Sequence, residues 1–129
     1  MKRKVALVTG GLSGEAQISY KSAITVGNNV DRTKYDLYKI DINATGWWYE
    51  NAVGEKSLVN RDDFSIVDNG NTIHFDVALM CIHGTPGEDG KLQGMLDMLE
   101  IPYIGAGVLG SAIGMDKEVQ KILVAHLGI

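Results

Sequence analysis

Short continuous apolar runs alternate along this chain with segments of helical periodicity, and this alternation constrains the fold more than any other feature. The clearest runs, residues 5–9 and 76–82, each lead into a glycine-containing loop. Such runs predict strands buried on both faces, as in a parallel sheet covered by helices. Parallel strands need long crossover connections, and the helical segments between the runs supply them. The chain is therefore predicted to be an α/β domain with a mainly parallel sheet flanked by helices.

The helical segments place apolar residues three and four positions apart, so each has one predicted buried face. The first face consists of Ala16, Tyr20, Ala23, Gly27 and Val30, and the second of Leu92, Met95, Leu96 and Leu99. A short helix of small residues is expected over residues 108–113. Asp116 is expected to cap a last helix, whose apolar face carries Val119, Ile122, Leu123 and Leu127.

Residues 35–42 and 102–104 are predicted to be further strands. Between them, residues 46–75 contain short β-like pieces and the strong turn sequence Asp68-Asn69-Gly70-Asn71. We therefore expect an antiparallel hairpin insertion in the parallel sheet.

Length and composition limit the possible functions. A chain of 129 residues is one domain by size, and its net charge of −4 comes without a basic stripe, which argues against nucleic acid or an anionic membrane as a partner. No targeting segment is recognisable, which favours the cytoplasm. The single cysteine, Cys81, is expected to be a buried small hydrophobe and not a nucleophile.

Two polar loops follow predicted strands, at residues 9–15 and 83–90. Because the carboxyl ends of parallel strands open on the same side of a sheet, Glu15 and His83 are predicted to line one pocket. A carboxylate in the first turn of a helix is a fixed negative charge suited to an ammonium group. The alternative for Glu15 is that it merely caps the helix dipole.

Two other readings of the sequence are weaker. Residues 5–11, VALVTGG, match the opening of short-chain dehydrogenases, but the last glycine of that pattern is replaced by Ala16, and Glu15 would repel a pyrophosphate. Tyr35 and Lys39 have a dehydrogenase-like spacing but fall in a predicted strand. The histidines have no partners at metal-ligand spacing, so no metal site is assigned.

Longer motifs are more specific: GGLSGEAQIS at 10–19, HGTPGEDGKLQGMLDMLEIPYIGAG at 83–107 and SAIGMDKEVQK at 111–121. In this order they resemble the amino-terminal part of D-alanine–D-alanine ligases, and the likeness covers nearly the whole chain. The resemblance implies a Rossmann-like, pre-ATP-grasp substrate-binding domain over residues 1–114. Residues 115–129 would form a helix that leads into ATP-grasp domains.

The resemblance also implies roles for single residues. Glu15 matches the catalytic glutamate that binds the ammonium of the first D-alanine, Ser19 the serine that supports it and His83 the histidine that lines that subsite. Lys117 matches a lysine that reaches toward the phosphates of ATP. The other groups that act on ATP and Mg²⁺ would lie beyond residue 129, so neither is expected to bind tightly here, and the chain alone is expected to be inactive.

The family commonly dimerises, so a homodimer is an expected partner arrangement. The alternative to a ligase domain is a free-standing α/β binding module.

Overall fold

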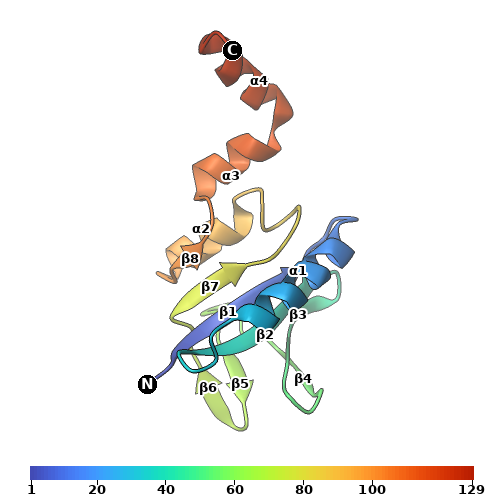
Figure 1. Cartoon of the computed structure of the whole chain (residues 1–129), viewed down its shortest axis with the longest axis vertical. Coiled ribbons are helices and arrows are strands. Elements are labelled where there is room, and N and C mark those ends of the chain that lie inside the picture. Colours follow the sequence, from blue (N-terminus) through green and yellow to red (C-terminus); the bar gives the residue numbers. More distant parts are fainter.

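The computed structural model describes residues 1–129 and confirms the mainly parallel α/β architecture (Figure 1). Six strands form the main sheet in the order β4-β3-β2-β1-β7-β8. Its parallel part consists of β2 (Tyr35–Asn43), β1 (Arg3–Gly10), β7 (Val77–Met80) and β8 (Tyr103–Ile104). Two antiparallel strands, β3 (Gly46–Glu50) and β4 (Lys56–Leu58), extend one edge.

Helices and a hairpin cover the two faces of this sheet. The chain has four helices, and only the first two lie on the sheet: α1 (Ala16–Asn29), α2 (Lys91–Met98), α3 (Val108–Met115) and α4 (Lys117–His126). On one face lies α1, where Gly27 approaches the side chains of Leu7 and Leu37. The other face packs against α2 and against the hairpin of β5 (Ile66–Asp68) and β6 (Asn71–Ile73).

The main hydrophobic core lies on the face opposite α1. Ala6, Val8 and Ala78 of the central strands are fully buried there. They belong to one cluster with Leu92 and Leu96 of α2, which confirms the predicted inner face of that helix. Aromatic rings from the hairpin region complete the cluster: Phe64 lies 6.0 Å from Trp47 and 5.7 Å from Phe75, measured between ring centroids.

The expected antiparallel insertion is present, but only part of it is separate from the parallel sheet. β3 pairs directly with β2, and β4 pairs with β3, so these two strands widen the main sheet. Only β5 and β6 form a sheet of their own, around the predicted turn. The sequence identified the turn correctly because its φ-positive residues, Asn69 and Gly70, are types that tolerate that conformation.

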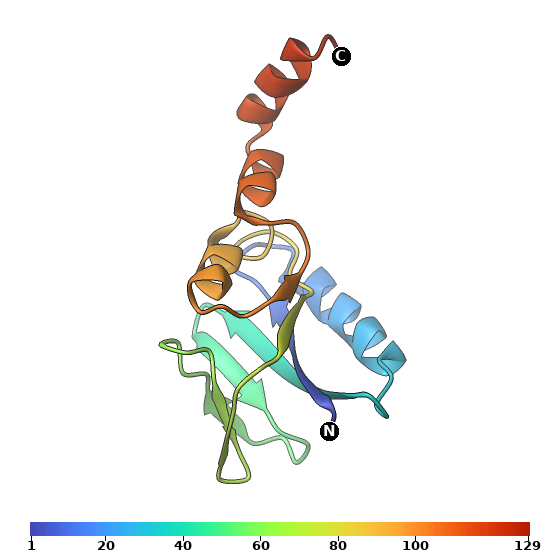
Figure 2. The ribbon, with the colours of Figure 1, turned by 90° about the vertical axis from the view of Figure 1, so that its left-hand side faces the viewer.

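The last helix differs from the sequence expectation in its burial. Asp116 caps α4 as predicted, since its carboxylate accepts hydrogen bonds from the amides of Glu118 and Val119, both at 3.0 Å. No residue of α4 is buried, however, and the face carrying Ile122 and Leu127 is exposed. Figures 1 and 2 show that α3 and α4 extend away from the sheet, so α4 has no sheet surface to cover. The division at residue 114 stays a prediction.

Two smaller expectations, the burial of Cys81 and the length of its strand, need correction. Cys81 is half-buried and not buried, and it lies just beyond β7, which is shorter than predicted. Burial still raises the pKa of its thiol.

Tyr35 and Lys39 both lie in β2, as predicted. No helix of this chain is both long and apolar enough to cross a membrane.

Candidate functional site

The loops that follow β1 and β7 lie side by side at the carboxyl edge of the parallel sheet. β1 and β7 are neighbouring parallel strands, so their connections leave the sheet on the same side. The amide of Leu12 donates to the carbonyl of Thr85 at 2.9 Å, and the Ser13 hydroxyl donates to the carbonyl of His83 at 3.2 Å. The structure thus brings together the two loops that the sequence singled out.

Helix α1 contacts His83 at both its backbone and its ring. The amide of His83 donates to Ser19 Oγ at 2.9 Å, and the imidazole Nε2 lies 3.1 Å from Ser22 Oγ. Ser19 is completely buried, which suits a residue that positions the loop and not one that touches a ligand itself. Ser22 was not recognised from the sequence, although it lies one helical turn from Ser19, at the i, i+3 spacing that puts two residues on one face.

Glu15 lies at the N-cap position of α1, one residue before the first turn in which the sequence placed it. Its side chain makes no capping hydrogen bond to the helix amides. The carboxylate forms no ion pair either, and the residue is exposed. It lies above Gly84, because a Cβ built on Gly84 would be 3.4 Å from Glu15 Oε2. An unpaired carboxylate therefore lies next to the His83 loop.

Gly84 makes this close approach of the loops possible. Its φ of 78° is a left-handed conformation that favours glycine, and a Cβ at this position would be 2.5 Å from Ser13 Oγ. The amide of Gly84 donates to Glu88 Oε2 at 2.7 Å. Glu88 thus shapes the loop.

Asp89 links the loop to the start of α2. Its carboxylate accepts hydrogen bonds from the Thr85 hydroxyl and from the amide of Lys91, and Lys91 Nζ lies 2.9 Å from Asp89 Oδ2. Burial tends to raise the pKa of the Asp89 carboxyl, but the hydrogen bonds from Lys91 and Thr85 outweigh it and hold the pKa below its usual value. Asp89 therefore ties the loop to the first residue of α2.

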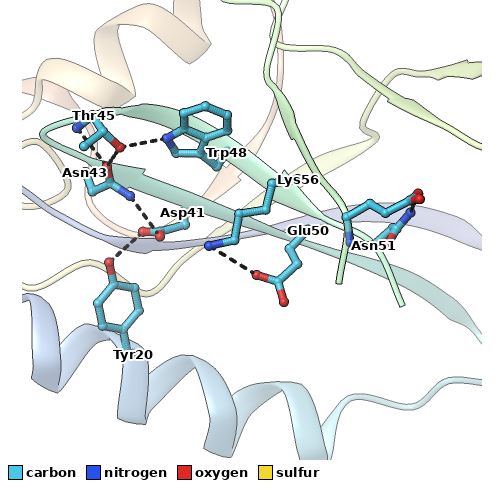
Figure 3. A network of polar contacts seen from close by, with 9 residues as sticks. Tyr20, Asp41, Asn43, Thr45, Trp48, Glu50, Asn51 and Lys56 are labelled. Carbon is cyan, nitrogen blue, oxygen red and sulfur yellow. Dashed lines mark hydrogen bonds and ion pairs between the residues drawn. The ribbon is translucent and has the colours of Figure 1, made fainter. Parts of the chain in front are cut away.

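A second polar contact attaches α1 to the sheet, and it was not predicted from the sequence. Tyr20 on α1 donates to Asp41 Oδ1 at 2.8 Å, and Asn43 donates to the other carboxylate oxygen at 3.0 Å (Figure 3). Burial, and then the hydrogen bond and charge of Asp41, raises the pKa of Tyr20 to about 12. Asp41 lies at the carboxyl end of β2, but both of its oxygens are bonded within the chain.

An open cavity of about 550 Å³ lies on the other side of the His83 loop. Ile82, Glu88, Gln93 and Met115 are among its lining residues, whereas Glu15, Ser19 and His83 are not. The contacts between the two loops define the candidate site, because they join the residues that carry charge and hydrogen-bonding capacity. Glu15 is exposed to solvent at this site.

Lys117 does not join these residues. It is the first residue of α4, it is exposed, and it forms no ion pair. Because α4 extends away from the sheet in Figure 2, Lys117 is carried on a separate element. No group of three or more histidine, cysteine, aspartate and glutamate side chains is placed to bind a metal ion.

The two interlocked polar loops lie at the carboxyl edge of a parallel sheet, which is the position where α/β domains bind small ligands. The family model for the D-Ala D-Ala ligase N-terminus matches residues 4–106, which is most of the chain. The chain therefore belongs to the family of D-alanine–D-alanine ligase amino-terminal domains. A D-alanine–D-alanine ligase of Bacteroides fragilis strain YCH46 is 44% identical over 129 residues, which are 100% of this chain and 40% of that protein.

Solved structures agree with this assignment. D-alanyl-alanine synthetase A from Vibrio cholerae has a TM-score of 0.87 at 28% identity, covering 99% of this chain and 38% of that one. The VanG D-Ala:D-Ser ligase from Enterococcus faecalis has a TM-score of 0.84 at 29% identity, covering 100% and 43%. A Bacillus anthracis D-alanine–D-alanine ligase complexed with ATP has a TM-score of 0.70 at 28% identity, covering 98% and 37%. The chain spans about 40% of the length of such relatives.

Replacing Ser19 by alanine should destabilise the protein, because the amide of His83 loses its partner in a buried setting. We expect the free energy of unfolding to fall by about 1–3 kcal/mol, measured by urea denaturation. Thr25→Ala is the control: it removes an exposed α1 hydroxyl bonded only to its own helix and should cost less than about 0.5 kcal/mol. Equal losses in the two variants would contradict the positioning role of Ser19.

Proposed function

We propose that this chain forms the part of an ATP-dependent D-alanine–D-alanine ligase that holds the first D-alanine. The observation that carries the proposal is the unpaired Glu15 carboxylate beside the His83 loop. A fixed negative charge without a protein partner suits the ammonium group of an amino acid. The long ordered likeness to ligase sequences gives this general chemistry its particular substrate.

The roles of the residues follow from their contacts. Glu15 binds the ammonium group, while the ring of His83 borders the same subsite. Ser19, being buried, acts through the backbone of His83 and not on the substrate. Holding the first substrate in one orientation lowers the entropic cost of bringing its carboxylate to the second reactant.

Lys117 is the one residue here that we propose for contact with ATP. Its exposed ammonium group has no carboxylate partner, so it is available to a phosphate oxygen. One lysine provides only a small part of the charge that phosphoryl transfer requires. Within this chain, magnesium is assigned no ligand.

In the complete protein, the proposed reaction activates the carboxylate of the first D-alanine as an acyl phosphate, with transfer of the terminal phosphate of ATP. The amine of a second D-alanine then attacks the carbonyl carbon, and phosphate leaves. The product is a dipeptide precursor for peptidoglycan, made in the cytoplasm. Because the D-Ala:D-Ser ligase shares this fold, we assign selection of the second substrate to the region outside residues 1–129.

Two further features belong to the same proposal. Residues 1–114 are the substrate-binding unit, and residues 115–129 lead into the ATP-grasp part. The complete protein forms a homodimer, as is common in the family.

The chain of residues 1–129 should not ligate D-alanine by itself, because it holds only one side of the proposed subsite. The test is phosphate release by the pure chain with D-alanine, ATP and magnesium ions. The expected result is a rate equal to that without protein. Turnover would show that the chain is catalytically sufficient and would contradict the proposal.

In a protein of the relatives' full length, Glu15→Gln should raise the KM for the first D-alanine and leave the KM for ATP unchanged. Loss of one charge-assisted hydrogen bond, worth about 1.5–3 kcal/mol, corresponds to a rise of roughly 10- to 150-fold. Glu100→Gln is a matched control, because Glu100 is exposed and follows the far end of α2. An unchanged KM for D-alanine in Glu15→Gln would rule out Glu15 as the anchor.

A further inference from the structure

The serine and threonine side chains of α1 form different hydrogen bonds. Ser19 Oγ donates to the carbonyl of Glu15 at 3.4 Å, and Thr25 Oγ1 donates to the carbonyl of Lys21 at 3.2 Å. Both are bonds to the carbonyl four residues earlier, a common use of serine and threonine in helices. Ser22 makes no such bond, and its one hydrogen-bond partner is His83 Nε2 at 3.1 Å. The hydroxyl proton of Ser22 is therefore free to be donated to the imidazole.

This difference bears on the tautomer of His83. A neutral imidazole carries its proton on one nitrogen and accepts hydrogen bonds at the other. If Ser22 donates to Nε2, then Nε2 is the acceptor and the proton is on Nδ1. Nδ1 makes no hydrogen bond within the chain and is not among the buried polar atoms that lack a partner. It is thus the ring nitrogen left for an external group.

We propose that Ser22 is a positioning residue that fixes His83 as the Nδ1–H tautomer, so that the site presents an N–H donor to its ligand. The two contacts from α1 have different roles. Ser19 holds the backbone of His83, and Ser22 sets the orientation and tautomer of its ring. The Ser22 hydroxyl is hydrogen-bonded to His83 and not to Glu15, Ser19 or Lys117.

The tautomer makes the two loops chemically complementary. The Glu15 carboxylate can only accept hydrogen bonds, whereas the Nδ1–H of His83 can donate one. An amino acid carries the reverse pair, an ammonium donor and carboxylate acceptors. The identification of the ligand as an amino acid rests on the proposed function. The Ser22–His83 contact and the tautomer do not depend on it.

The tautomer can be measured without any substrate. The chain has three histidines, so a protein labelled with [¹⁵N]histidine gives few signals, and His83→Gln identifies those of His83. At a pH where imidazoles are neutral, we expect the Nδ1 of His83 to be protonated and its Nε2 to be unprotonated. Ser22→Ala should give a mixture of the two tautomers, Ser22→Thr should restore the single form because it keeps a hydroxyl, and Thr25→Ala should change nothing.

A protonated Nε2 in the unaltered protein, or an unchanged spectrum in Ser22→Ala, would overturn the proposal. Circular dichroism of each variant shows whether the fold is retained, and the threonine variant tests the role even where alanine lowers stability. In a protein of full length, Ser22→Ala should also raise the KM for the first D-alanine roughly three- to tenfold, the effect of one neutral hydrogen bond. Absence of any D-alanine ligation in that protein would refute the proposed function, while the tautomer result would remain valid.

Discussion

The contact between α1 and His83 is the interaction on which the candidate site depends. Without it, the loop after β7 would keep its hydrogen bonds to the loop after β1, from Leu12 and Ser13, but it would lose its attachment to the helix. The backbone of His83 is bonded to Ser19 and Ser13, and its ring to Ser22. Ser19 and Ser22 belong to α1, so their short side chains attach the glycine-rich loop to a rigid helix. A rigid helix is a more precise support for a binding residue than a loop.

The sheet gives this contact its geometry. β1 and β7 are parallel neighbours, so both loops begin at the same edge, and α1 packs back against β1. The Tyr20–Asp41 hydrogen bond attaches the same helix to β2. α1 is thus fixed to the sheet near its start and contacts the second loop from there. The exposed Glu15 lies at the N-cap of this helix and makes no capping hydrogen bond with it.

Much of this arrangement could be predicted from the sequence, because it depends on patterns that are local. The apolar runs predicted the strands, and the spacing of Leu92 and Leu96 predicted the inner face of α2. Other features depend on distant pairs and leave no local pattern. The Ser22–His83 contact joins residues 61 positions apart, and Tyr20–Asp41 joins residues 21 positions apart. The apolar residues of α4 were correctly placed on one face, but periodicity cannot tell whether a surface exists for that face to cover.

The central claim is that Glu15 and His83 together form one side of an amino-acid subsite. A crystal structure of the full-length protein with D-alanine tests it most directly. The account predicts the ammonium group within hydrogen-bond distance of the Glu15 carboxylate, with the His83 ring bordering the same molecule. An amino acid bound elsewhere, with Glu15 and His83 both unliganded, would contradict it.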